Sequence, residues 1–83
     1  MKLIVLDRDG VINENLERPV STPEEWVPIP GSLEAIARLH QAGWHVAVAT
    51  NQSGISRGLI TLQTLHAIHQ HMQEKVVQAG GRI

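Results

Sequence analysis

The sequence predicts an α/β fold with parallel strands, and two observations support this prediction. Two short apolar runs, LIVL at residues 3–6 and WHVAVA at residues 44–49, are each followed further along by a segment with helical periodicity. Such runs, without alternating polar residues, are typical of strands buried on both faces of a parallel sheet. The order strand, loop, helix, strand, loop, helix then favours parallel pairing with right-handed crossovers.

Helical spacing marks two segments. The first is expected over residues 33–42, with Ser32 as its N-cap and Gly43 as its C-terminal stop. The second begins after Thr61, which is a suitable cap, and carries an apolar stripe that ends before Gly80. The stripe consists of Leu65, Ile68, Met72, Val76 and Ala79.

Between the first strand and the first helix lies a segment without any sustained period, from Gly10 to Pro30. It contains all 4 prolines of the chain. Structureless loops longer than about 15 residues are usually functional lids or disordered segments. We therefore interpret residues 10–30 as a flap that borders a binding site.

The chain has 83 residues, which is enough for at most one small domain with a modest core. A sheet of two strands leaves an exposed edge and an uncovered face, whereas doubly wound domains typically need about five strands. We therefore expect residues 1–83 to be one partial domain, the N-terminal half of a truncated three-layer α/β domain.

Composition gives no reason to expect a nucleic acid or a membrane as partner. The chain is 42% hydrophobic and 18% charged, with a formal net charge of -1. It has no cysteine, and so neither disulfides nor thiolate ligands for zinc. The apolar run near the N-terminus is too short for a signal peptide or a membrane span, so we expect a cytoplasmic monomer.

Polar residues follow both predicted strands. Asp7 and Asp9 come after the first strand. The second strand is followed by a polar cluster, Thr50, Asn51, Gln52 and Ser53. Ligands of open α/β sheets bind beyond the carboxyl ends of the strands, so the two groups should lie side by side. In an extended chain Asp7 and Asp9 point to one side, and Arg8 points away from them.

Two carboxylates at one point repel each other, and a divalent cation relieves that repulsion. Magnesium suits such a site because it binds through one or two carboxylates together with a substrate phosphate. One aspartate can attack a phosphoryl group and the other can transfer protons, while hydroxyl and amide groups stabilise the phosphoryl oxygens. The alternative is that these residues only satisfy the backbone groups of ordinary turns.

DRDGVIN at residues 7–13 and ATNQSGISRG at residues 49–58 resemble the first and second motifs of the haloacid dehalogenase superfamily of phosphohydrolases. The second motif and the connecting segment at residues 28–44 are similar to the branch of D-glycero-D-manno-heptose 1,7-bisphosphate 7-phosphatases, whose near relatives are the histidinol-phosphate phosphatases. The resemblance implies a Rossmann-like, haloacid-dehalogenase-like fold. It also implies a magnesium-dependent phosphatase that works through an aspartyl-phosphate.

The same resemblance implies roles for individual residues. Asp7 matches the nucleophile and a magnesium ligand. Asp9 matches the general acid/base, which also ligates magnesium through its backbone carbonyl. Thr50 matches the residue that holds the transferring phosphoryl group. The remaining substrate contacts fall on Asn15, Arg18, Asn51, Gln52, Ser53 and Arg57.

Several parts of the family's site have no counterpart in these residues. They are the lysine of a third motif, the acidic residues of a fourth motif and, in the heptose branch, a Cys/His loop that binds zinc. The flap also differs, because it reads ENLERP where family members often carry an Asp and a Tyr. Loss of one charged partner at a phosphoryl-transfer site costs orders of magnitude in rate, so we expect the 83 residues alone to be inactive.

Other residues with reactive or bulky side chains are interpreted as structural. They are His66, His69, His71, Trp26, Trp44 and Arg8. The histidines flank the apolar stripe and are not expected to hold a metal, the tryptophans can pack, and the arginine alternates away from the carboxylates. Two of these residues keep a second interpretation. Trp26 lies in the flap and could cover a ligand, and Arg8 could act as a clamp.

The leading hypothesis is a phosphatase that removes the 7-phosphate of a heptose bisphosphate on the route to bacterial surface polysaccharide. One alternative is a phosphatase of histidinol phosphate or another small molecule. Another is a non-catalytic module that binds phosphate or accepts a phosphoryl group. A third is a scaffold fragment whose open sheet edge pairs with a partner.

Overall fold

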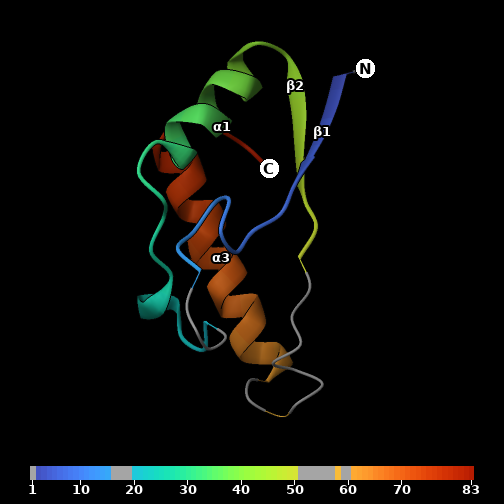
Figure 1. The fold of residues 1–83 in the computed structure, drawn as a ribbon. Helices are drawn as coiled ribbons and strands as arrows, with labels where there is room; N and C mark the ends of the chain where they lie inside the picture. The colour runs from blue at the N-terminus through green and yellow to red at the C-terminus, as the bar shows by residue number, and fades with distance from the viewer. Residues whose placement is uncertain (1, 16–19, 51–57, 59–60) are drawn as a thin grey trace.

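The computed structural model describes residues 2–15, 20–50, 58 and 61–83, and the elements follow one another in the predicted order (Figure 1). The strands are β1, Lys2–Leu6, and β2, Trp44–Val48. The helices are α1, Ser32–Gln41, α3, Leu62–Gln78, and a short 3-10 helix, η1, Pro23–Glu25. None of the helices in the described ranges has both the length and the hydrophobicity that crossing a bilayer requires.

Strands β1 and β2 pair in parallel, as predicted. The register places Leu6 opposite Val48 at the carboxyl end of the sheet. A hydrogen bond of 2.9 Å from the Ala49 N–H to the Leu6 carbonyl carries the pairing one residue past β2. The chain segments that follow the two strands therefore start side by side.

Both long helices lie on the same side of the two strands (Figure 1). Helix α1 packs on β2, and α3 packs on α1 and on η1. On the open side, Leu3 and Val5 keep 51% and 57% of their surface exposed. The prediction that the first strand is buried on both faces is therefore wrong for β1. None of the described residues forms a helix over the face that carries Leu3 and Val5. The uncovered face expected of a two-stranded sheet is confirmed.

Helix α3 supplies more buried hydrophobic residues than any other described helix or strand, through the predicted stripe. Its buried residues are Leu65, Ile68, Met72 and Val76. Ala79, the fifth predicted member, is exposed and lies at the C-cap. Thr61 caps the start of the helix as predicted, because its Oγ1 accepts a hydrogen bond of 3.1 Å from the Thr64 N–H.

Helix α1 begins and ends one residue earlier than predicted. Its N-cap is Gly31, whose φ of 88° lies in the left-handed region that favours glycine. Ser32, the predicted N-cap, is instead the first helical residue, and its hydroxyl donates to the Ile12 carbonyl at 2.7 Å. This bond ties the start of α1 to the chain that follows β1.

The segment expected to be a long loop is packed against the core in its described part. Ile12, Val20 and Trp26 are exposed by only 1%, 2% and 3%, and all three belong to the core. The Ile29 N–H donates to the Ile12 carbonyl at 2.9 Å, which joins the two ends of the segment. The predicted loop is therefore confirmed for residues 10–15 and 20–30, where η1 is the only helix and no strand is described, but this loop is packed into the core. The sequence did not reveal this because the apolar residues occur singly among prolines, without any period.

Candidate active site

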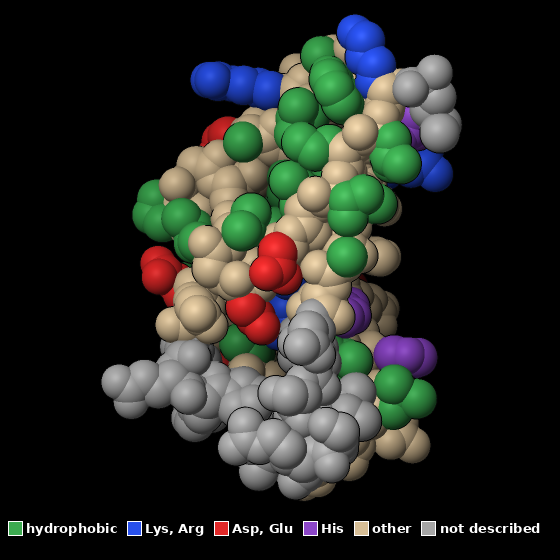
Figure 2. Space-filling model, turned by 45° about the vertical axis from the view of Figure 1, so that its right-hand side comes forward, with side chains coloured by type: hydrophobic (Ala, Val, Ile, Leu, Met, Phe, Trp, Pro, Cys, Tyr) green, Lys and Arg blue, Asp and Glu red, His purple; other side chains and the backbone are tan. Residues whose placement is uncertain are grey.

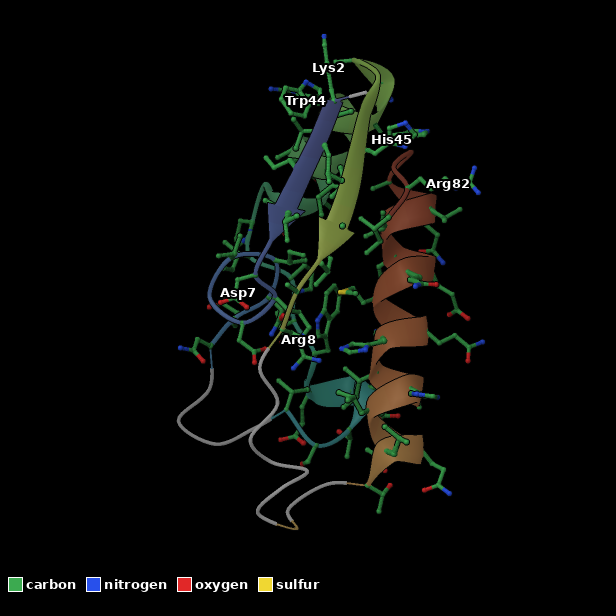
Figure 3. The ribbon with its side chains drawn as sticks, turned by 90° about the vertical axis from the view of Figure 1, so that its right-hand side faces the viewer. Lys2, Asp7, Arg8, Trp44, His45 and Arg82 are labelled. Atoms are coloured by element: carbon green, nitrogen blue, oxygen red, sulfur yellow. The ribbon has the colours of Figure 1, made fainter. Side chains whose placement is uncertain are left out.

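Asp7 is the first residue after β1 and is exposed at the carboxyl end of the sheet (Figure 3). Its Oδ1 accepts a hydrogen bond of 2.8 Å from the backbone N–H of Arg8. The carboxylate is thus oriented by the peptide that follows it and stays accessible to solvent. Accessibility and orientation are what a nucleophile needs to reach a phosphoryl group.

Thr50 follows β2 at the same end of the sheet, as predicted. It is partly buried and lines a pocket of about 180 Å³. His69 and Met72 of α3 and the C-terminal Ile83 also line this pocket. A threonine hydroxyl in this position can donate a hydrogen bond to an anionic oxygen.

Asp9 does not continue the extended conformation of β1. A turn intervenes, in which the Arg8 carbonyl accepts hydrogen bonds of 3.2, 2.8 and 3.1 Å from the N–H groups of Val11, Ile12 and Asn13. Gly10 permits this turn with a φ of 83°. Alternation of side chains holds only in an extended chain, so the prediction that Arg8 points away from both carboxylates is wrong.

The Arg8 side chain is completely buried and pairs with Asp9. Its Nε and Nη2 donate to Asp9 Oδ1 at 3.1 and 2.9 Å. The Nδ2 of Asn13, which is also fully buried, donates to the same oxygen at 3.0 Å. Together Arg8 and Asn13 form an Asp9 clamp. The sequence analysis missed Asn13, for which the only signal was an amide side chain four residues after an aspartate.

The other predicted site residues lie at the border of the described chain or beyond it. Asn15 is described and is exposed. Arg18, Asn51, Gln52, Ser53 and Arg57 lie outside the described residues. The described part of the candidate site therefore consists of Asp7, Asp9 and Thr50, with Asn15 nearby in sequence.

The described residues fit a magnesium ion. Asp7 is exposed, and Asp9 keeps 28% of its side-chain surface exposed, so carboxylate oxygens reach the surface beyond β1. Figure 2 shows acidic side chains close to one another near the middle of the face in view. Magnesium commonly uses one or two carboxylates and completes its shell with water and phosphate. Among the described residues, no group of three or more His, Asp or Glu side chains is suited to a metal ion.

His69 lies on α3, near enough to Arg8 and Asp9 to feel their charges. Burial lowers the pKa of His69 from its ordinary value of 6.5, and the positive charges of Arg8 and His66 lower it further. The negative charge of Asp9 acts in the opposite direction, but the net effect is a lower pKa. The His69 imidazole is therefore neutral near pH 7.

The stability of the fold is expected to fall as the pH drops below 6.5, partly because of His69. In the unfolded chain His69 has its ordinary pKa, so acid protonates the unfolded state before the folded state. The stability that the neutral His69 side chain contributes is fully present above pH 6.5. It decreases as the pH falls below 6.5, and the decrease ends once the pH is below the lowered pKa of the folded state. Urea unfolding at about pH 7.5 and about pH 5.5 measures the difference.

The His69→Gln variant should lose less stability between these two pH values than the native chain. His40→Gln, at an exposed position of α1, is the control and should behave like the native chain. Equal pH dependence in the native chain and the His69→Gln variant would contradict the lowered pKa.

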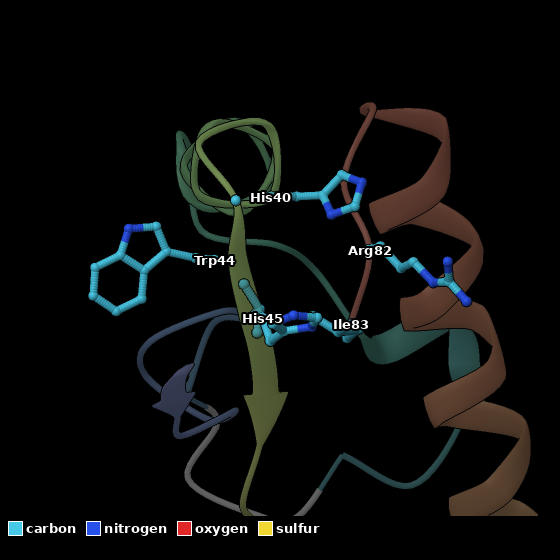
Figure 4. Close-up of a pocket in the computed structure, with 7 residues that line it drawn as sticks. His40, Trp44, His45, Arg82 and Ile83 are labelled. Atoms are coloured by element: carbon cyan, nitrogen blue, oxygen red, sulfur yellow. The ribbon is translucent and has the colours of Figure 1, made fainter. Parts of the chain in front are cut away.

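A larger hollow, of about 470 Å³, lies at the other end of β2 (Figure 4). It is lined by His40, Gly43, Trp44, His45, Val46, Arg82 and Ile83. None of the predicted site residues is among them. The Trp44 ring centroid lies 6.0 Å from the Nζ of Lys2, a contact that agrees with a packing role for this partly buried side chain.

Comparison with known proteins gives relatives that match the whole chain. No family model matches. A protein of Pseudomonas putida named D-glycero-beta-D-manno-heptose-1,7-bisphosphate 7-phosphatase is 58% identical over 83 residues, which are 100% of this chain and 47% of that protein. The chain thus spans about half the length of the curated relatives it matches.

Solved structures give the same result. D,D-heptose 1,7-bisphosphate phosphatase from Bordetella bronchiseptica, complexed with magnesium and phosphate, has a TM-score of 0.97 and 55% identity, over 100% of this chain and 46% of that one. A protein of Mesorhizobium loti described as a HAD-like phosphatase has a TM-score of 0.86 and 40% identity, over 99% of this chain and 38% of that one. The predicted fold and the predicted resemblance to heptose bisphosphate phosphatases are therefore confirmed.

Proposed function

We propose, from its similarity to heptose bisphosphate phosphatases over its whole length, that this chain carries the nucleophilic half of a magnesium-dependent phosphatase. The substrate of the complete enzyme is D-glycero-D-manno-heptose 1,7-bisphosphate, which loses its 7-phosphate. The observation that carries the proposal is the position of Asp7, exposed and oriented at the end of β1, beside the segment that begins with Thr50.

In the first step, Asp7 attacks the phosphorus of the 7-phosphate, and the bond between phosphorus and the sugar oxygen breaks. The electron pair of that bond stays on the sugar oxygen, which takes a proton from Asp9. The products are the free 7-hydroxyl and an aspartyl-phosphate on Asp7. The exposure of Asp7 supports its part in this step, since the phosphoryl group must arrive in line with the attacking oxygen.

In the second step, water attacks the phosphorus of the aspartyl-phosphate while Asp9, now ionised, takes a proton from the water. The bond between phosphorus and the Asp7 oxygen breaks, its electron pair returns to the carboxylate, and inorganic phosphate leaves. In both steps the Thr50 hydroxyl donates a hydrogen bond to a phosphoryl oxygen as negative charge develops there.

Magnesium would be held by the Asp7 carboxylate and by Asp9, the latter through its backbone carbonyl. When bound, the ion neutralises charge on the phosphoryl group and orients it. The proposed substrate contacts are Asn15, Arg18, Asn51, Gln52, Ser53 and Arg57. The lysine, the further acidic ligands and a zinc loop would come from the part of the enzyme that this chain does not include.

We also propose that the enzyme is a cytoplasmic monomer, with residues 10–30 serving as a substrate flap.

A hybrid enzyme tests the proposal. Residues 1–83 are joined to the part of the Pseudomonas putida relative that follows its matching segment. With magnesium, the hybrid enzyme should release phosphate from the heptose bisphosphate, and phosphorus NMR should show that the 7-phosphate leaves. The 83-residue chain alone should release phosphate at least about 10³-fold more slowly, because it lacks charged partners of the transition state.

Three outcomes would contradict parts of the proposal. Rapid magnesium-dependent turnover by the 83-residue chain would show that it needs no further residues. Selective hydrolysis of histidinol phosphate by the hybrid enzyme would assign a different substrate. A folded hybrid enzyme that retains phosphate on Asp7 without releasing it would favour the phosphoacceptor alternative.

A further inference from the structure

We propose that Arg8 and Asn13 are positioning residues, which fix the orientation of the Asp9 carboxylate through Oδ1. The inference rests on the proposed function, in which Asp9 is the general acid and base. It adds the residues that hold the Asp9 carboxylate in a fixed orientation for proton transfer.

The first observation is that three donors converge on one oxygen. Arg8 Nε, Arg8 Nη2 and Asn13 Nδ2 lie 3.1, 2.9 and 3.0 Å from Asp9 Oδ1. Two of these hydrogen bonds come from a guanidinium and are strengthened by its charge. A carboxylate oxygen that accepts three such bonds can take a proton only by losing some of them. The three donors on Oδ1 therefore fix the orientation of the whole Asp9 carboxylate.

The second observation is that both donor side chains are buried. Arg8 and Asn13 each have 0% of their surface exposed, and the Asp9 side chain has 28%. Burying a guanidinium costs desolvation free energy, which a buried ion pair often fails to recover in stability. Apolar side chains of similar size would fill the same space without that cost. What the charged and amide side chains supply is a fixed orientation for Asp9.

The third observation is that the backbone around the clamp is held in place. The Arg8 carbonyl accepts three N–H donors of the turn, and the Gly10 N–H donates to the Asn13 carbonyl at 2.8 Å. Asn13 Nδ2 also donates to the Glu14 carbonyl at 3.0 Å. The Ser32 hydroxyl anchors the turn to α1 through the Ile12 carbonyl. The clamp is therefore built on a turn whose own hydrogen bonds limit its movement.

The arrangement explains a difference between the two aspartates. Asp7 is oriented by a single backbone N–H and is exposed, as suits a nucleophile that forms and breaks a bond to phosphorus. Asp9 is held by two side chains, as suits a group that must present one atom to the leaving oxygen and later to water. Positioning of the second aspartate is thus built into the residues beside it in the motif.

The test compares two substrates in the hybrid enzyme, because they depend differently on proton transfer. The sugar oxygen of the heptose bisphosphate is a poor leaving group and needs a proton. The second substrate, 4-nitrophenyl phosphate, releases 4-nitrophenolate, which leaves without a proton. The variants are Arg8→Met and Asn13→Ala, and Arg38→Met at an exposed position of α1 is the matched control.

In the Arg8→Met variant, kcat/KM for the sugar phosphate should fall about 10- to 100-fold. For 4-nitrophenyl phosphate, kcat/KM should fall less than about threefold, because phosphoryl transfer to Asp7 needs no acid. For the same substrate, kcat should fall more than kcat/KM, because the attack of water on the aspartyl-phosphate still needs Asp9 as a base. Phosphorylated enzyme should therefore accumulate in acid-quenched samples. Asn13→Ala should give the same pattern with smaller changes, and Arg38→Met should give none.

The outcomes separate this inference from the proposed function. Undiminished turnover by an Asp9→Asn variant would overturn both. The inference alone would be overturned by two results together. Asp9→Asn would lose turnover, and kcat/KM in Arg8→Met and Asn13→Ala would fall by the same factor for both substrates, as a general structural defect predicts. If Arg8→Met fails to fold, Asn13→Ala decides, because it removes one donor without leaving a buried charge unpaired.

Discussion

The Asp7→Asn variant of the hybrid enzyme is expected to lose at least about four orders of magnitude in kcat. An amide of the same shape keeps the hydrogen bond that Asp7 Oδ1 accepts from Arg8, but it cannot act as a nucleophile toward phosphorus. The loss should appear with every phosphate ester, because the aspartyl-phosphate is common to all of them. Phosphate release at saturating substrate measures it.

Two controls keep this result specific. Glu34→Gln makes the same carboxylate-to-amide change at an exposed position of α1 and should leave turnover unchanged. With 4-nitrophenyl phosphate, whose leaving group needs no proton from Asp9, mass spectrometry of acid-quenched samples should find a phosphoryl group on the Asp9→Asn variant and none on Asp7→Asn. Near-normal turnover by a pure Asp7→Asn protein would exclude Asp7 as the nucleophile and with it the proposed mechanism.

Signals confined to a few residues explain why much of the fold could be predicted from the sequence. The uninterrupted apolar run before Asp7 marks a strand, and Thr61 followed by a regular stripe marks a capped helix. Parallel pairing follows from the order of the elements, since short crossovers connect parallel neighbours. Once the pairing is known, the ends of the strands must meet, which brings Asp7 and Thr50 to one edge.

The details that the sequence did not reveal depend on contacts between distant residues or on backbone geometry. Whether the first strand is covered on both faces depends on elements elsewhere in the domain. The orientation of Arg8 depends on a turn that begins after Asp7 and that alternation cannot describe. An arginine between two acidic residues would ordinarily be expected at the surface, and its complete burial follows from the fold around it.

The Trp26→Ala variant is expected to lose about 3–5 kcal/mol of unfolding free energy, the largest stability effect predicted for this chain. Trp26 follows η1 and is 3% exposed, in the same core cluster as Ile68 and Met72 of α3. Its ring meets the His71 ring edge-on, with 5.9 Å between centroids and 84° between planes. A loss of this size is a large fraction of the 5–15 kcal/mol that typically holds a domain together.

Trp44 provides the matched control, because Trp44→Ala removes the same side chain from a partly buried position on β2 and should cost less than half as much. Urea unfolding of the hybrid enzyme measures both losses. Trp26→Phe should recover most of the difference, because it keeps an aromatic ring in the core. If residues 10–30 were only a mobile lid, Trp26→Ala would cost little and Trp44→Ala more. The burial of Trp26 predicts the reverse order, since a segment that contributes a core tryptophan cannot leave the fold without destabilising the turn that carries Asp9.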